Sequence, residues 1–316
     1  MAIRRYGVGL RREGIAVSTL VVFCCDQTYF PLAKGLVLSF QSAGLEQSGI
    51  ALGFIDIGCN PESLKWFADQ GIRIVPYSAL MAIDDMRLVS GHVRYHLAQL
   101  CRPHLPRLFP GASCLIWLDS DLWIQIGDSL KQLASWATGD RERIFICPEW
   151  HYSYATMNND ILSFHVRNVG SYYAEAYGEE LALKLAVRPF LNTGVFAMAA
   201  ESPLWDMWAT ELRALITRKY SHNASLHMAD GLSLTRLVAE TARGVLVDPL
   251  FNFACIWALP VRDDAGVVRV PLPPYAPIGI VHLNMWMTRR RFYFENRLLF
   301  QEGRYLTDEE RRSLLS

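Results

Sequence analysis

The stretch CLIWLDSDLWI, from Cys114 to Ile124, decides how the rest of the chain is interpreted. Five apolar residues lead directly into Asp119-Ser120-Asp121, and apolar residues then resume. Such a run suits a buried parallel strand and is far too short for a membrane-spanning helix. In an open α/β sheet, ligands bind at the carboxyl ends of the strands. The two aspartates therefore stand where a functional site is expected.

Asp119 and Asp121 predict a metal site. Two like charges placed so closely repel, and each carboxyl group resists ionising beside the other. A divalent cation removes this conflict, and hard oxygen ligands suit Mg²⁺ or Mn²⁺. Phosphatases of the haloacid dehalogenase type also carry Asp-x-Asp after a strand. Their motif lies on the first strand and continues with Thr or Val, whereas Leu122 follows here and three strand-like segments come first.

The composition describes a balanced globular chain. Its 316 residues are 51% hydrophobic, which is enough for one large α/β domain or two modest ones. With 31 basic and 31 acidic residues the net charge is zero, so no nucleic-acid partner is expected. The seven cysteines form no C-x-x-C pair and mostly lie in apolar runs. They predict reduced thiols and a cytoplasmic protein.

Strand-like and helix-like segments alternate along the chain. This alternation predicts an α/β fold with a Rossmann-like, mixed but mainly parallel sheet flanked by helices. The expected strands are residues 17–25, 51–57, 72–76, 114–118, 143–148, 190–199, 245–248 and 278–283. The expected helices are residues 30–43, 61–68, 92–102, 127–138, 203–219 and 229–240, with one or two more within 160–187. Pro103 and Pro106 are expected to end the third helix. The buried face of the helix at 203–219 is expected to hold Leu204, Met207, Trp208, Leu212 and Ile216.

Four later residues could add to the site. His282 follows an apolar pair at another strand end, so it is either a third metal ligand or a packed core histidine. Asn192 and Gly194 lie within a strand, where neither is favoured, and mark either close approach of a ligand or a bulge. Asp230 opens a helix and is either a first-turn acid or a catalytic group.

The order of these motifs resembles the GT-A glycosyltransferases, and most closely glycosyltransferase family eight. Residues 21–29 resemble the family's opening strand, and residues 115–121 resemble its aspartate-x-aspartate metal motif. Residues 190–196 resemble the strand that contacts the sugar. Asp230-Gly231 stands where the family usually has aspartate-glutamine, and residues 280–283 resemble the late strand with a histidine metal ligand.

This resemblance implies a glycosyltransferase of the hexosyltransferase class, which moves a sugar from a UDP-sugar to an acceptor hydroxyl with retention. It implies that Asp119, Asp121 and His282 bind Mn²⁺ or Mg²⁺. It implies catalytic roles for Asn192 and Asp230. The residues expected to bind the nucleotide sugar are Cys25, Asp26, Tyr29, Asp119, Ser120, Gly194, Arg289 and Arg290.

The chain departs from the family pattern at three places. Gly231 replaces the usual glutamine, and the usual lysine-proline-tryptophan motif is missing after the late histidine. Arg289 or Arg290 would then replace the lysine that holds the diphosphate, unless both lie on a solvated turn. The family arginine before the metal strand could be Arg94 or Arg102. A non-catalytic nucleotide or carbohydrate binder therefore stays an alternative. A sugar nucleotidyltransferase is another, although no Gly-rich loop follows the first strand.

One domain, residues 1–316, is expected. Its first half, about 17–150, would bind nucleotide and metal, and its second, about 151–290, the donor sugar and the acceptor. A tail at 291–316 completes the chain. Residues 149–152 could line the site of an unidentified glycan, lipid-linked or protein acceptor, or pack in the core. Residues 285–300 interleave arginines with aromatics and could rest on the inner membrane face or cover the active site.

Overall fold

The computed structural model describes most of the chain and leaves five segments outside the description. The described residues are 19–83, 95–157, 164–217 and 228–284. Several sequence predictions therefore lie outside them, namely those for Arg94, Arg289, Arg290, the stretch at 285–300 and the tail at 291–316.

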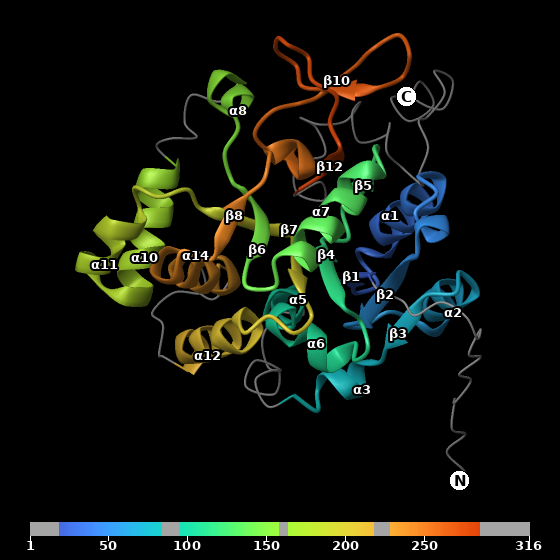
Figure 1. Cartoon of the computed structure of the whole chain (residues 1–316), viewed down its shortest axis with the longest axis horizontal. Helices are drawn as coiled ribbons and strands as arrows, with labels where there is room; N and C mark the ends of the chain where they lie inside the picture. The colour runs from blue at the N-terminus through green and yellow to red at the C-terminus, as the bar shows by residue number, and fades with distance from the viewer. Residues whose placement is uncertain (1–18, 84–94, 158–163, 218–227, 285–316) are drawn as a thin grey trace.

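A seven-stranded sheet forms the centre of the fold (Figure 1), with the strand order β3-β2-β1-β4-β7-β6-β8. All of its neighbouring pairs are parallel except the two that involve β7, which runs antiparallel to β4 and to β6. This arrangement confirms the predicted α/β class with a mixed, mainly parallel sheet. The strands are β1 (Thr19–Cys25), β2 (Ile50–Asp56), β3 (Arg73–Val75), β4 (Cys114–Leu118), β6 (Ile144–Pro148), β7 (Leu191–Ala199) and β8 (Gly244–Leu246).

Helices cover both faces of this sheet because successive strand residues point to opposite sides. Val21 packs into the cluster that contains α1, α2 and α7, while Val22 packs with α5, α10, α11, α12 and α14. No helix of the described segments combines the length and the apolar character needed to cross a membrane. The helices that cover the two faces are α1 (Phe30–Ser42), α2 (Pro61–Asp69), α5 (Tyr95–Leu100), α7 (Asp128–Gly139), α10 (Gly170–Tyr177), α11 (Glu179–Leu185), α12 (Leu204–Thr217) and α14 (Ala229–Thr241).

Short helical segments connect the main elements. Three are single α-helical turns or little more, namely α3 (Tyr77–Leu80), α6 (Leu105–Leu108) and α8 (Tyr152–Met157). The others are η1 (Glu46–Ser48), η2 (Arg102–His104), η3 (Phe164–Val169) and η4 (Pro249–Phe251).

A second, three-stranded sheet joins β12, late in the described part of the chain, to β5, which directly follows the aspartates. In it β12 (Ile280–His282) runs antiparallel to β5 (Leu122–Ile124) and parallel to β9 (Phe253–Ala254). A separate hairpin of β10 (Val261–Arg262) and β11 (Val268–Arg269) lies nearby in Figure 1. Because β5 begins directly after the aspartates, this sheet carries the end of β12 to them.

The helix expected at 92–102 ends at Leu100, just before the proline region expected to end it. Pro103 and Pro106 then each lie in the first turn of a new short segment, η2 and α6. Proline is accepted there since the first N–H groups of a helix have no intrahelical partner. The buried face predicted for α12 is wrong in part: Met207 is 38% exposed and Ile216 only partly buried, whereas Trp205 and Leu215 are buried.

Candidate functional site

Asp119, Asp121 and His282 converge at the carboxyl end of β4. One ligand atom of each lies within 4.8 Å of the others. The Nε2 atom of His282 is 3.2 Å from Asp121 Oδ1 and 3.9 Å from Asp119 Oδ2. Asp121 and His282 are buried, and Ser120 is buried between the two aspartates. Two carboxylates and an imidazole are a donor set that fits a divalent cation such as Mn²⁺.

Backbone pairing holds these three residues together although one is distant in sequence. His282 lies opposite Leu122 in the β5–β12 register, and the N–H of Leu283 donates to the carbonyl of Asp121 over 3.0 Å. The N–H of Asp119 donates to the carbonyl of Gly194 on β7 over 2.9 Å. The cluster is therefore set by the ends of three strands.

The imidazole of His282 is oriented by Asn252. Its Nδ1 lies 2.8 Å from Asn252 Oδ1, and because a carbonyl oxygen can only accept, Nδ1 carries the proton. Nε2 is thereby turned toward the two carboxylates, as in histidines that ligate metals. Burial lowers the pKa of His282, but Asp121 and Asp119 raise it more, so that the pKa lies above its ordinary value. The site thus favours a positive charge.

We expect Asn252→Ala to weaken Mn²⁺ binding by about 10–100-fold, because the proton on Nδ1 loses its acceptor and the ring loses its fixed orientation. Asn252→Asp keeps an oxygen acceptor in place and should retain most of the affinity. Titration with Mn²⁺, followed by electron paramagnetic resonance of the free ion, measures both. Equal losses in the two variants would contradict the orienting role.

The two oxygens of Asp119 have different partners. Oδ1 accepts hydrogen bonds from the indole Nε1 of Trp117 over 2.8 Å and from Arg102 over 2.6 Å. Oδ2 is the oxygen that faces His282. The guanidinium of Arg102 also lies over the Trp117 ring, 5.0 Å from its centroid. Trp117 and Arg102 thus fix one oxygen and leave the other directed into the cluster.

Arg102 joins Asp119 to the third acid of the site. Its other terminal nitrogen donates to Asp230 and, over 2.6 Å, to Thr193 Oγ1, which itself donates to Asp230 over 2.8 Å. Burial lowers the pKa of Arg102, but Asp119 and Asp230 raise it above its ordinary value. Asp230 does lie in the first turn of α14. Its carboxylate is nevertheless buried and neutralised by Arg102, which favours a positioning role over that of a base.

The strand β7 forms a bulge at the site, as one of the two predicted alternatives has it, while close approach of a ligand stays a prediction. On β6, Ile146 pairs with Phe196 but the next residue pairs with Asn192, and residues 193–195 are left without partners on that strand. The Oδ1 atom of Asn192 accepts from the N–H of Gly194 over 2.9 Å. A β-carbon on Gly194 would lie 2.7 Å from His282 Cε1 and 3.0 Å from Asp119 Oδ2. Only glycine leaves room for the cluster, so the residues present fit a bound cation.

Gly194→Ala is expected to lower Mn²⁺ affinity by about tenfold or more, because the added methyl group displaces His282 from its ligating position. Gly139→Ala is the matched control, since no atom lies within 4 Å of the methyl group it adds at the end of α7. The same Mn²⁺ titration measures both variants. Full affinity in Gly194→Ala would show that the cluster tolerates the displacement and is not a tight metal site.

The predicted nucleotide-binding residues Cys25, Asp26 and Tyr29 lie at the carboxyl end of β1, next to β4 in the sheet. Asp26 Oδ1 accepts from the N–H groups of Thr28 and Tyr29, over 2.9 and 3.2 Å, and so shapes the turn before α1. The buried thiol of Cys25 lies 3.7 Å from the sulfur of Cys59, and burial raises its pKa well above the ordinary value. These residues share one rim of the sheet with the cluster of Asp119, Asp121 and His282.

A cavity of about 340 Å³ opens on the cluster and contains residues that the sequence did not single out as ligands. Phe190 is one, and a β-carbon on Gly231 would lie 2.7 Å from its ring. The ring therefore fills the space into which a glutamine at position 231 would extend. The lining includes Gln99, Arg102, Asp119, Asp121, Glu149, Phe190, Asn192, Thr193, Gly194, Asp230, Gly231, Ile256, Trp257 and His282.

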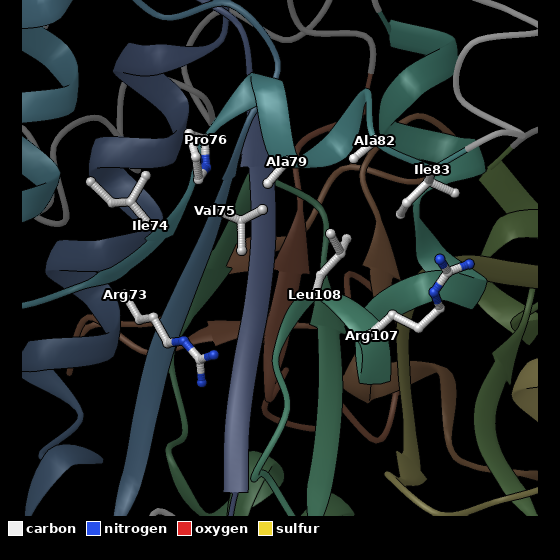
Figure 2. Close-up of a pocket in the computed structure, with 9 residues that line it drawn as sticks. All are labelled: Arg73, Ile74, Val75, Pro76, Ala79, Ala82, Ile83, Arg107 and Leu108. Carbon is white, nitrogen blue, oxygen red and sulfur yellow. The ribbon is translucent and has the colours of Figure 1, made fainter. Parts of the chain in front are cut away.

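A second cavity, of about 350 Å³, lies between β3, α3 and α6 (Figure 2). Its lining combines apolar side chains with two arginines, and Figure 2 shows Arg73 and Arg107 on opposite sides of Leu108. Arg73 donates to the carbonyl of Pro110 over 3.3 Å and lies over the ring of Phe109. None of the predicted site residues lines this cavity, so the first cavity is the candidate site.

Comparisons with known proteins identify the fold. No family model and no curated protein matches the chain by sequence. Among solved structures, the galactosyltransferase LgtC in complex with donor and acceptor sugar analogues matches with a TM-score of 0.53 and 13% identity, over 93% of this chain and 99% of LgtC. Mouse xyloside xylosyltransferase 1 matches with a TM-score of 0.51 and 14% identity, over 84% of this chain and 97% of that one. The chain therefore has the GT-A fold.

Proposed function

We propose that this chain is a metal-dependent glycosyltransferase related to family eight, which transfers a sugar from a UDP-sugar to an acceptor hydroxyl with retention. The observation that carries the proposal is the cluster of Asp119, Asp121 and His282 at the carboxyl end of β4. The two named enzymes with the same fold are a galactosyltransferase and a xylosyltransferase. The fold alone would not assign the reaction, because one fold can host several activities.

The reaction breaks the bond between the anomeric carbon and the phosphate oxygen, and the electron pair leaves on the nucleoside diphosphate. The acceptor oxygen bonds to the same carbon, and its proton passes to the departing diphosphate. A divalent cation, when bound, would offset the negative charge that develops on the diphosphate. In this proposal Asp119, Asp121 and His282 hold that cation, and Cys25 and the residues after it hold the nucleotide.

The remaining side chains would position the donor sugar. Asn192 offers both a donor and an acceptor to sugar hydroxyls. Arg102 donates to both Asp230 and Asp119 and so holds their carboxylates in place. Because Oδ2 of Asp230 already accepts from Arg102 and Thr193, this oxygen is not free to take the acceptor's proton, which supports a retaining route in which the leaving diphosphate takes it.

A non-catalytic binder is the second candidate, and one observation favours it. Phe190 occupies the space beside Gly231 where the family's glutamine would extend. A chain without that amide could still bind a nucleotide sugar and metal through the cluster. Hydrolysis of the bound donor separates the two candidates, because a binder would not accelerate it.

The test is calorimetric titration of UDP with and without Mn²⁺, followed by a hydrolysis assay on UDP-, GDP- and ADP-sugars. We expect binding of UDP only with Mn²⁺, and slow hydrolysis of at least one UDP-sugar. Binding that is absent or independent of metal would overturn the proposed metal role. Tight Mn²⁺-dependent binding with no hydrolysis of any donor would favour the binder.

A further inference from the structure

A carboxylate and an indole meet across the candidate site. The Nε1 of Trp257 donates to Glu149 Oε1 over 2.8 Å, and both residues line the cavity that opens on the metal cluster. Glu149 follows β6 of the large sheet, whereas Trp257 follows β9 of the small one. The hydrogen bond therefore joins the two sheets on the cavity wall.

Glu149 is held in register with the bulged strand. Pro148 pairs with Leu191 on β7, and the N–H of Glu149 donates to the carbonyl of Phe190 over 2.7 Å. The next residue of β7 after Leu191 is Asn192, which pairs with Cys147 on β6. The position of the Glu149 carboxylate is thus fixed relative to the residues proposed to contact the donor sugar.

Trp257 is held in register with a metal-cluster residue. Ala254 pairs with His282 between β9 and β12, and the N–H of Cys255 donates to the carbonyl of His282 over 2.9 Å. A turn then follows, in which the N–H of Trp257 donates to the carbonyl of Ala254 over 3.1 Å. The backbone that carries Trp257 is therefore held by its pairing with β12, the strand that carries His282.

The strand order places this pair on one side of the cluster. Along the sheet, β1 comes before β4, and β7 and β6 come after it. β1 ends at Cys25 and is followed by Asp26, and β6 ends at Pro148 and is followed by Glu149. If the nucleotide lies over β1 and its diphosphate lies at β4, then the donor sugar lies over β7. The acceptor, on the far side of that sugar, then lies at the end of β6.

We propose that Glu149 and Trp257 form the acceptor subsite and that the acceptor presents a pyranose ring there. An indole offers a flat apolar face to the C–H face of such a ring. A carboxylate accepts strong hydrogen bonds from the ring hydroxyls, and the indole N–H holds this one in place. The proposal rests on the proposed function for the direction of the reaction, and its test measures sugar binding separately from donor binding.

The experiment measures binding of methyl α- and β-pyranosides of glucose, galactose, mannose and N-acetylglucosamine by saturation-transfer NMR and titration. Each is tested with the full chain alone and with UDP and Mn²⁺ present. We expect at least one pyranoside to bind, and Trp257→Ala and Glu149→Gln each to weaken it by about tenfold or more. Trp150→Ala is the matched control, because Trp150 adjoins Glu149 but is 45% exposed and does not line the cavity. This variant should bind the pyranoside as well as the unchanged chain does.

The outcomes separate this proposal from the function proposed above. A pyranoside that binds without UDP, and is lost in Trp257→Ala, supports the subsite even if UDP does not bind. The subsite is overturned if no pyranoside binds under either condition, or if Trp257→Ala binds as well as the Trp150→Ala control. Equal loss of UDP–Mn²⁺ and pyranoside binding in Trp257→Ala would also overturn it, because the pair would then belong to the donor site.

Discussion

Asp121→Asn is expected to remove Mn²⁺-dependent UDP binding and any hydrolysis of a UDP-sugar. Asp121 is buried, and its Oδ1 lies 3.2 Å from His282 Nε2. Loss of an outer partner of a metal ligand already costs about 10–100-fold in affinity, so loss of a ligand should cost about 100-fold or more. Titration of UDP at fixed Mn²⁺ and a donor hydrolysis assay measure the two effects.

The metal-free protein should keep nearly its full stability in this variant. The change stabilises the fold by removing one of two neighbouring like charges, and destabilises it by removing one partner of His282. Because these effects oppose each other, the free energy of unfolding should change by about 1 kcal/mol or less. Asp128→Asn is the matched control because Asp128 is exposed and pairs with Lys131 on α7. Binding of UDP and Mn²⁺ to Asp121→Asn at the affinity of this control would remove the basis of the proposed function.

The parts of the fold that sequence predicts well are those encoded by local pattern. The apolar run at Cys114–Leu118 forms a fully buried strand, and the strands and helices around it fall close to their predicted bounds. The same pattern cannot reveal strand direction. That β7 runs antiparallel between two strands follows from tertiary pairing, and so does the small sheet that brings His282 to Asp121.

The parts of the candidate site that sequence misses depend on single contacts between distant segments. Trp117 lies in an apolar strand and looks like core, yet its indole donates to Asp119. Asn252 and Trp257 stand in an irregular segment without a motif, and only the β9–β12 register reveals their partners. No periodicity could have found them. Arg102 did offer one signal in the sequence. It lies near apolar residues, and an arginine that becomes buried needs acidic partners.

Arg102→Met is expected to destabilise the chain more than any other single change considered for the site. Arg102 is buried and bonds to both Asp119 and Asp230, the second of which is also buried. Removing one partner of a buried ion pair leaves an uncompensated charge and typically costs about 3–5 kcal/mol. Urea denaturation of the metal-free protein measures the loss. Asp230→Asn in the same chain should restore part of it, because the uncompensated carboxylate is then gone.

The matched control for this change is Arg73→Met. Both guanidinium groups lie over an aromatic ring, Arg102 over Trp117 at 5.0 Å and Arg73 over Phe109 at 5.4 Å. Arg73 is exposed, so its loss should cost about 1 kcal/mol or less. The difference between the two variants therefore isolates the buried carboxylates from the ring contact. If both variants lose the same stability, or if Asp230→Asn makes Arg102→Met worse, then Arg102 is not the counter-charge of the two carboxylates. The positioning role proposed for Asp230, which depends on its ion pair with Arg102, then loses its support.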